Sequence, residues 1–343
     1  MRSAILGKHM YESFYGLKEN PFRMTPDPKF LYLGANHKEA LAQLWYGVSE
    51  KKGFIVITGE VGTGKTTLVH SLLDRLNGNG STKTALLFNP KLDVNDFLQY
   101  ILKDFGVKVR KGSKGDHLQA LHKYLLETYE NNGKVVLIVD EAQTLDPELL
   151  EELRLLSNLE TSKSKLLQII LVGQPELNTT LSRPEFRQLK QRINLRYHIP
   201  PLSREETNEY IERRLRIAGA QGPLFTKRAV KEIYEKSGGI PRLINILCDN
   251  ALLNGYASDQ KKVDETLVKE AAKDLELATK SFQGWIWIIL GILMAMGIFL
   301  LFYVREEGSL LPFFSRYREG LQYLKEDISK TILSLYEYIT KGA

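Results

Sequence analysis

Cysteine is nearly absent from this sequence, since Cys248 is the single example among 343 residues. One thiol cannot close an intramolecular disulfide, and it cannot supply a cysteine-rich structural zinc site. The chain also has no large excess of positive or negative charge. It contains 47 lysine and arginine residues and 41 aspartate and glutamate residues, for a net charge of +6. This mild excess permits nucleic acid or anionic lipid as a partner and argues for neither.

Histidine is scarce as well, with six residues scattered along the chain. His117 and His122 stand closest, and a spacing of five residues does not bring two side chains together on one face of a helix. We therefore expect neither a mononuclear zinc site nor Ser-His-Asp chemistry.

The remaining composition is that of a folded protein, with 43% hydrophobic and 26% charged residues. At about 150 residues per domain, the length predicts two globular units, or one unit with appendages. The first ten residues contain no long apolar stretch, so we expect no secretory signal peptide. Met10 is an alternative to Met1 as the start of translation.

One long uncharged run is present, the twenty residues from Trp285 to Val304. Its length matches the hydrocarbon core of a bilayer, about 30 Å thick. Trp287 and Tyr303 lie near its two ends, where aromatic rings favour the headgroup level. We therefore expect one transmembrane helix over residues 285–304.

A short tail, residues 305–343, follows that run and carries six basic and six acidic residues. Its apolar residues recur at steps of three and four, which predicts an amphipathic helix. These residues are Tyr317, Leu321, Leu324, Ile328, Ile332, Leu335 and Ile339. Such a helix can self-associate, lie on a membrane surface or pack on a partner, and its periodicity does not choose among these.

Short apolar runs alternate with helical segments before the Pro200-Pro201 pair. The predicted strands are 53–58, 85–88, 134–139, 166–172 and 195–199. Continuous apolar strands that alternate with helices predict an α/β fold with a parallel sheet, covered on both faces. After the two prolines only helical signals follow, beginning with a capping box from Ser203 to Glu206. We expect an α/β core over residues 1–200 and a helical lid over residues 201–280.

A phosphate-binding loop is predicted between the first strand and the first helix of that core. It matches G-x-x-x-x-G-K-[ST], in which glycines let backbone N–H groups turn toward phosphate oxygens at the start of a helix. Lys65 would reach the β- and γ-phosphates, and the Thr66 hydroxyl would bind Mg²⁺. The predicted nucleotide-binding residues are Gly59, Glu60, Val61, Gly62, Thr63, Gly64, Lys65, Thr66 and Thr67.

An acidic pair ends the third predicted strand and supplies the second half of the site. Asp140 would hold Mg²⁺, directly or through water, and Glu141 would polarise the attacking water. Without a phosphate-binding loop, the same pair would be read as two solvent-facing carboxylates. With the loop, it predicts an ATP- and Mg²⁺-dependent enzyme.

The chain resembles the AAA+ P-loop ATPases of the general secretion pathway protein A (ExeA-like) family. It carries that family's opening block, Met10 to Leu17 with Asn20-Pro21-Phe22, and a Gly173 to Leu177 segment (GQPEL). The similar exosortase-locus secretion ATPases share this opening. The resemblance covers residues 10–280 and implies an AAA+ core with a helical lid.

The resemblance also implies roles for four further residues. Asn89 takes the position of a polar switch that restrains the catalytic glutamate, and Gln174 takes the sensor-1 position near the γ-phosphate. Arg192 resembles the arginine finger that reaches a neighbouring subunit's nucleotide, with Arg187 as the alternative. Arg242 resembles the sensor-2 arginine of the lid.

Together these features predict a homo-oligomeric ATPase that serves an envelope secretion or export machine. Because ATP is cytoplasmic, the predicted span implies a single-pass inner-membrane protein with its ATPase domain in the cytoplasm. Pro21-Phe22 would pack near the adenine or in the core. Two alternatives remain, an ATP-dependent DNA-binding regulator of the transposition-ATPase type and a nucleotide-gated scaffold that barely hydrolyses.

Overall fold

The computed structural model describes residues 10–275, except residues 26, 79, 89, 90 and 109–111, together with Met294. The chain divides into two compact units, residues 1–278 and 279–343, and the elements described below belong to the first. The predicted switch residue Asn89 lies outside the described residues. So do the predicted span and tail, apart from Met294.

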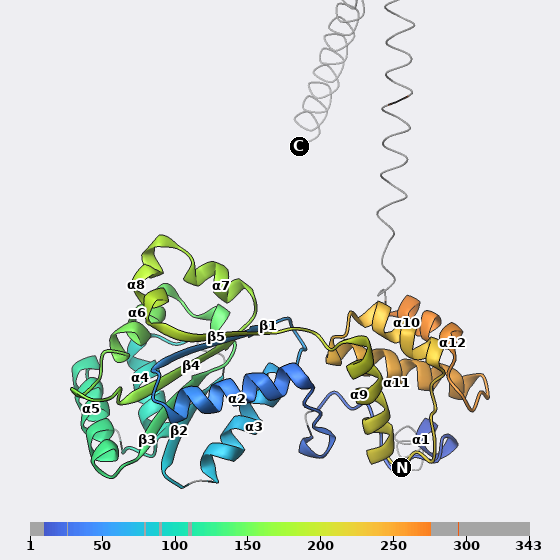
Figure 1. The fold of residues 1–343 in the computed structure, drawn as a ribbon, viewed down its shortest axis with the longest axis horizontal. Helices are drawn as coiled ribbons and strands as arrows, with labels where there is room; N and C mark the ends of the chain where they lie inside the picture. The colour runs from blue at the N-terminus through green and yellow to red at the C-terminus, as the bar shows by residue number, and fades with distance from the viewer. Residues whose placement is uncertain are drawn as a thin grey trace, which may run out of the picture. The chain divides into compact units, whose positions relative to one another are not determined.

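A five-stranded parallel sheet forms the centre of the α/β part, as the apolar runs predicted (Figure 1). Its spatial order is β2-β3-β4-β1-β5. The strands are β1 (Phe54–Gly59), β2 (Thr82–Leu87), β3 (Lys134–Val139), β4 (Leu167–Gly173) and β5 (Ile193–Ile199). Because β1 lies between β4 and β5, the loop after β1 opens beside the carboxyl ends of both neighbours.

The central strands are apolar throughout because both of their faces are covered. Alternate residues of β3 enter different hydrophobic clusters, Leu137 on one face and Ile138 on the other. The first face packs against α4 (Val94–Asp104), α5 (Lys114–Glu130) and α6 (Pro147–Leu156). The second packs against α2 (Ala35–Ser49) and α3 (Lys65–Asn77).

The other helices of the sheet domain are short, and they lie before and after β4. They are η2 (Ala142–Thr144), α7 (Glu176–Leu181), η3 (Pro184–Phe186) and α8 (Arg187–Arg192). The last of these leads directly into β5, so it ends at the amino edge of the sheet.

Within residues 200–275, which the structure describes, four helices follow β5. They are α9 (Arg204–Ile217), α10 (Lys227–Ser237), α11 (Pro241–Ala257) and α12 (Glu265–Asp274). Ser203 and Glu206 form the predicted capping box at the start of α9. Such a box satisfies two backbone N–H groups that the first helical turn cannot pair. Thr226 and Asp264 cap α10 and α12 in a similar way.

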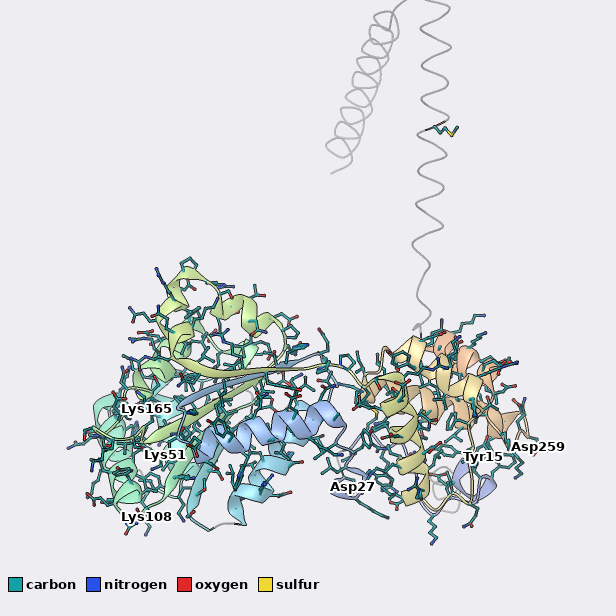
Figure 2. The ribbon with its side chains drawn as sticks, viewed as in Figure 1. Tyr15, Asp27, Lys51, Lys108, Lys165 and Asp259 are labelled. Carbon is teal, nitrogen blue, oxygen red and sulfur yellow. The ribbon has the colours of Figure 1, made fainter. Side chains whose placement is uncertain are left out.

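The N-terminal segment packs with these four helices rather than with the sheet. It comprises α1 (Met10–Phe14), η1 (Pro28–Phe30) and the loops around them. Its buried side chains belong to the same hydrophobic cluster as α9–α12; they are Tyr11, Tyr15, Leu17, Phe22 and Phe30. Tyr15 is labelled in this helical group in Figure 2. The Phe22 side chain was expected either near the adenine or in the core, and its 1% exposure supports the core position.

Arg214 of α9 fastens the N-terminal segment from inside the helical group. It is 7% exposed, and its Nε donates to the Pro21 carbonyl oxygen at 2.6 Å. Its guanidinium lies over the Phe30 ring at 5.0 Å and donates to the Tyr210 hydroxyl at 2.7 Å. A buried guanidinium stays charged, so these carbonyl, hydroxyl and aromatic partners replace its lost hydration.

The prediction of a transmembrane helix needs correction. Within the described residues, the longest helices, α5 and α11, have 17 residues each, and none of the helices is both long and apolar enough to cross a bilayer. A span needs about 20 predominantly apolar residues. The predictions of a helix spanning the membrane at residues 285–304 and of a single-pass inner-membrane protein are therefore not retained.

Two adjacent glycines at the end of α10 give a matched test of backbone strain. Gly239 has φ +76°, and a Cβ there would lie 2.0 Å from the Leu202 carbonyl oxygen. Gly238 has φ +58° with nothing within 4 Å of such a Cβ. We predict that Gly239→Ala lowers the free energy of unfolding by more than about 2 kcal/mol, because a clash adds to the left-handed strain.

Gly238→Asn serves as the control, since asparagine tolerates the left-handed region and meets no neighbour there. It should change the free energy of unfolding by less than about 1 kcal/mol. Thermal unfolding of both variants measures the difference. Equal losses would show that the approach to Leu202 does not constrain the fold.

Candidate active site

The phosphate-binding loop lies where its motif requires, between β1 and α3. Gly62 and Gly64 have φ values of +82° and +93°, a region that L side chains rarely adopt. Gly59 is needed for space, because a Cβ there would lie 2.9 Å from the Ile199 carbonyl oxygen. The three glycines therefore let the chain turn tightly beside β5 and enter α3, whose amino terminus favours anions.

Lys65 is buried at the start of α3, with its ammonium group folded into its own loop. Its Nζ donates to the carbonyl oxygens of Gly59 and Glu60 at 2.8 and 2.9 Å. Burial lowers the pKa of Lys65 from its ordinary value, while the carboxylates of Glu141 and Asp140 oppose that shift. A buried ammonium group held by neutral carbonyls is ready to exchange them for anionic phosphate oxygens.

Thr66 and Asp140 face each other across the loop. The Thr66 hydroxyl donates to Asp140 Oδ2 at 2.8 Å, and Asp140 Oδ1 accepts from the Glu141 N–H at 2.9 Å. Asp140 is 2% exposed at the carboxyl end of β3. This donor set, a hydroxyl and a carboxylate, consists of the oxygen ligands that Mg²⁺ prefers.

Glu141 has a strained backbone conformation, and two glutamine side chains bind its carboxylate. Its φ of +53° is uncommon for a non-glycine residue, and such strain is typical of functional sites. Glu141 Oε2 accepts from Gln143 Nε2 at 2.6 Å and from Gln174 Nε2 at 3.3 Å. The Gln174 N–H in turn donates to Gln143 Oε1 at 2.9 Å. The carboxylate is therefore fixed between the ends of β3 and β4.

A cavity of about 730 Å³ brings part of the predicted phosphate residues together with the helical group, whereas Gly59, Glu60 and Asp140 do not line it. Residues 61–67, Glu141 and Gln174 line it, and so does Arg242 at the start of α11. The Arg242 N–H donates to the Gly62 carbonyl oxygen at 3.3 Å, which places the predicted sensor-2 residue beside the loop. A cavity of this size suits a nucleotide or a ligand of similar dimensions.

The N-terminal segment forms a large part of the cavity wall; the sequence analysis placed only Pro21-Phe22 of this segment near a nucleotide, and neither of those two residues lines the cavity. Its lining residues are Arg23, Met24, Thr25, Asp27, Phe30, Leu31 and Tyr32. Asp27 is labelled on this segment in Figure 2. The helices add Tyr210, Arg214 and Asn245 to the same cavity. The opening block is not a general feature of P-loop proteins, which indicated a special role for this segment. The spacing of its residues did not indicate that it would line a ligand cavity.

Gln143 and His37 were also missed. Gln143 follows the acidic pair by two residues and bonds to Glu141. His37 belongs to α2 and makes a 2.7 Å hydrogen bond to the Thr63 carbonyl oxygen in the phosphate-binding loop. Neither residue stands in a motif whose spacing predicts a contact. For His37 the reason is that α2 and the phosphate-binding loop are separate in the sequence and meet only in the folded structure.

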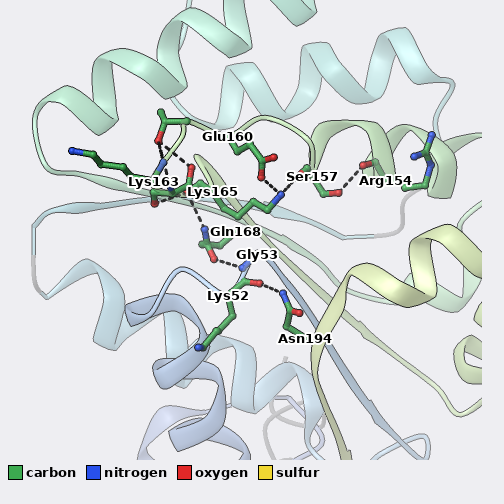
Figure 3. Close-up of polar contacts among 11 residues, drawn as sticks. Lys52, Gly53, Arg154, Ser157, Glu160, Lys163, Lys165, Gln168 and Asn194 are labelled. Atoms are coloured by element: carbon green, nitrogen blue, oxygen red, sulfur yellow. Dashed lines mark hydrogen bonds and ion pairs between the residues drawn. The ribbon is translucent and has the colours of Figure 1, made fainter.

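Arg192 and Arg187 do not line the cavity, so the structure does not bring either finger candidate to this chain's own phosphate-binding loop. Both belong to α8, which ends where β5 begins, at the opposite edge of the sheet. Figure 3 shows how that edge is tied together: the Gly53 N–H donates to Gln168 Oε1 at 2.7 Å, and Lys165 pairs with Glu160. Lys165, with a smaller contribution from Arg192, lowers the pKa of Glu160.

Comparison with known proteins agrees with this geometry. An AAA domain matches residues 48–181. General secretion pathway protein A from Aeromonas hydrophila is 45% identical over 255 residues, which cover 74% of this chain and 46% of that protein. An uncharacterized HTH-type transcriptional regulator of Methanocaldococcus jannaschii is 25% identical over 70% of this chain and 61% of that protein. The matched regions thus span less than two thirds of either relative.

Solved structures show the same fold at low sequence identity. The Aeropyrum pernix ORC2 protein in its ADPNP–ADP complexes has a TM-score of 0.57 at 20% identity, covering 74% of this chain and 71% of that one. A chain of the Drosophila ORC bound to DNA has a TM-score of 0.59 at 19% identity, covering 77% of this chain and 66% of that one. The resemblance to general secretion pathway protein A is confirmed by the 45% identity, residues 48–181 match an AAA domain, and the fold is that of the ORC proteins.

Proposed function

We propose that this protein hydrolyses ATP, with Mg²⁺ at Thr66 and Asp140, to power or regulate an envelope secretion or export machine. One observation carries the enzymatic part. Lys65 and Glu141 line a single cavity, and the Glu141 carboxylate is oriented by Gln143 and Gln174. A cation for the phosphates and an aligned base are what phosphoryl transfer to water requires.

The chain's own residues divide the work in this proposal. The amides of the loop and the amino terminus of α3 bind the phosphates, and Lys65 exchanges its bonds to Gly59 and Glu60 for phosphate oxygens. Glu141 orients a water and accepts its proton. Gln174 shares its amide between Glu141 and the γ-phosphate, so its position depends on whether that phosphate is present.

Mg²⁺ fits the oxygen donors that the chain provides. Thr66 and Asp140 would hold the ion, whose charge neutralises the β- and γ-phosphate oxygens. In the described residues no cluster of three or more acidic, histidine or cysteine side chains offers a competing site. The single buried carboxylate suits a metal that keeps water and phosphate ligands.

Oligomerisation is proposed because both finger candidates lie far from this chain's own loop. Ile193, next to Arg192, pairs in register with Phe54, five residues before Gly59 at the loop. At about 3.3 Å per residue, this separation is roughly 17 Å along the sheet. An arginine at that edge can act on the nucleotide of a neighbouring copy, as the resemblance implies for Arg192.

The secretion partner is proposed from the similarity to general secretion pathway protein A. The matched region covers 46% of that relative, and we propose that this chain serves a secretion or export machine of a similar kind. Capturing partners of the full chain with ATP bound would identify the component. A partner set without secretion or export proteins would contradict this part.

A DNA-binding role is a second candidate, favoured by a basic segment. Between Arg183 and His198 there are five lysine or arginine residues and one acid, Glu185. Four of these cations, Arg183, Arg187, Lys190 and Arg196, are exposed on η3, α8, β5 or the loop before them. The relationship to an HTH-type regulator adds weight to this alternative.

We predict that Glu141→Gln retains ATP binding and lowers the hydrolysis rate by about 10²–10³-fold, because glutamine cannot accept the proton of water. Lys65→Ala should instead lose ATP binding, since the buried cation is removed. Steady-state turnover and calorimetric titration separate the two effects. Wild-type turnover in Glu141→Gln would remove this residue from catalysis and favour the scaffold alternative.

For the finger, we predict that Arg192→Ala leaves ATP affinity unchanged and slows hydrolysis by at least about 10²-fold in the assembled state. The matched control is Arg187→Ala, on the same helix. Turnover measured as a function of protein concentration identifies the assembled state. If Arg187→Ala shows the loss and Arg192→Ala does not, Arg187 is the finger.

For the DNA candidate, four phosphate contacts predict an affinity that falls by about 10²-fold between 50 and 200 mM salt. Fluorescence anisotropy with a labelled duplex measures this slope. The double variant Arg187→Ala, Lys190→Ala should flatten it. Absence of duplex binding at low salt would exclude the DNA-binding role.

A further inference from the structure

His37 is a buried residue that forms a hydrogen bond to the phosphate-binding loop. It stands at the third position of α2 and is 4% exposed. Its Nε2 lies 2.7 Å from the Thr63 carbonyl oxygen. Because a carbonyl only accepts, Nε2 must carry the hydrogen of this bond. Nδ1 has no partner in the described part of the chain, so among these residues the Thr63 bond is the one polar contact of the ring.

The bond fixes the orientation of one peptide plane. A trans peptide directs its carbonyl oxygen and its N–H to opposite sides, and no described bond is cis. While the Thr63 oxygen points to His37, the N–H of Gly64 in the same peptide points away from His37, which lines the cavity beside the loop. Glycine at 64 leaves room for this approach, because a Cβ there would lie 3.3 Å from His37 Nε2.

The preceding peptide is held in a similar manner from the helical group. The Gly62 carbonyl oxygen accepts from the Arg242 N–H at 3.3 Å. Two successive carbonyls of the loop are thus bound from outside by different elements, α11 and α2. The Thr63 N–H of the first peptide donates to the Glu60 carbonyl oxygen at 3.2 Å, so the Gly64 N–H of the second is the one whose direction matters for an incoming phosphate.

The start of α2 is itself fixed by hydrogen bonds, so the backbone that carries His37 has a defined position. The Ala35 N–H donates to Glu206 Oε1 at 2.8 Å, and Glu206 Oε2 accepts from the Ser203 N–H at 2.9 Å. One carboxylate therefore joins the beginnings of α2 and α9. His37, two residues further on, lies against the loop from a fixed point.

We propose that His37 is a positioning residue, which aims the Gly64 N–H into the phosphate site by holding the Thr63 carbonyl oxygen. The proposal rests on the proposed binding of ATP by this loop. It assigns to α2 a part in nucleotide affinity that neither the P-loop motif nor the acidic pair supplies. A preset amide does not have to be reoriented when phosphate binds, which strengthens binding.

Two variants of similar polarity separate this role from simple packing. The amide of glutamine reaches the place of Nε2, whereas the amide of asparagine ends near the place of Nδ1. We expect His37→Asn to weaken ATP affinity by roughly tenfold, the size of one lost hydrogen bond. His37→Gln should stay within about threefold of wild type, because its amide restores the donor. The kcat at saturating ATP should change little in both, since the Glu141 network is untouched.

The experiment uses calorimetric titration of the full chain with ATP, steady-state kinetics, and thermal unfolding without nucleotide to confirm that each variant folds. If His37→Asn fails to fold, His37→Leu replaces it as the variant without a donor. Wild-type affinity in the donor-free variant, or equal weakening in His37→Gln, would overturn the role of His37. If wild type itself neither binds nor hydrolyses ATP, the proposed function fails instead.

Discussion

The orientation of backbone amides between β1 and α3 is the constraint on which the site depends. Gly62 and Gly64 adopt positive φ values, so the loop can turn its N–H groups inward, and its outward carbonyls need partners. Arg242 and His37 supply them at Gly62 and Thr63. The Glu141 carboxylate is fixed in a similar way, since Gln143 and Gln174 donate to it from neighbouring strand ends.

The N-terminal segment gives the helical group both its core and its share of the cavity. Arg214 donates to the Pro21 carbonyl oxygen and lies over Phe30, so one buried guanidinium secures a segment that lacks long helices of its own. Seven of the residues just after this anchor, between Arg23 and Tyr32, then line the cavity beside the phosphate-binding loop. The same short segment therefore contributes both to the core of the helical group and to the wall of the cavity.

Local patterns predicted much of this architecture. Apolar runs located the five strands, the capping box located α9, and the P-loop motif located Lys65 and Thr66 beside Asp140. Other contacts left no trace in the sequence pattern: His37 comes from a distant segment, Gln143 stands two residues from Glu141 but in no ligand spacing, and residues 23–32 carry no helical or strand period. The apolar run at 285–304 showed the reverse failure, because hydropathy alone predicted a span that no described helix supports.

The chain passes between the sheet and the helical group at two places, near Gly34 and near Leu202. These crossings touch, since a Cβ on Gly34 would lie 3.3 Å from Leu202 Cδ2. Residues 10–32 share one hydrophobic cluster with α9–α12, so a displacement at these two crossings would carry both together. Tyr32 and Arg242, which line the cavity from these two parts, would then shift jointly relative to the sheet.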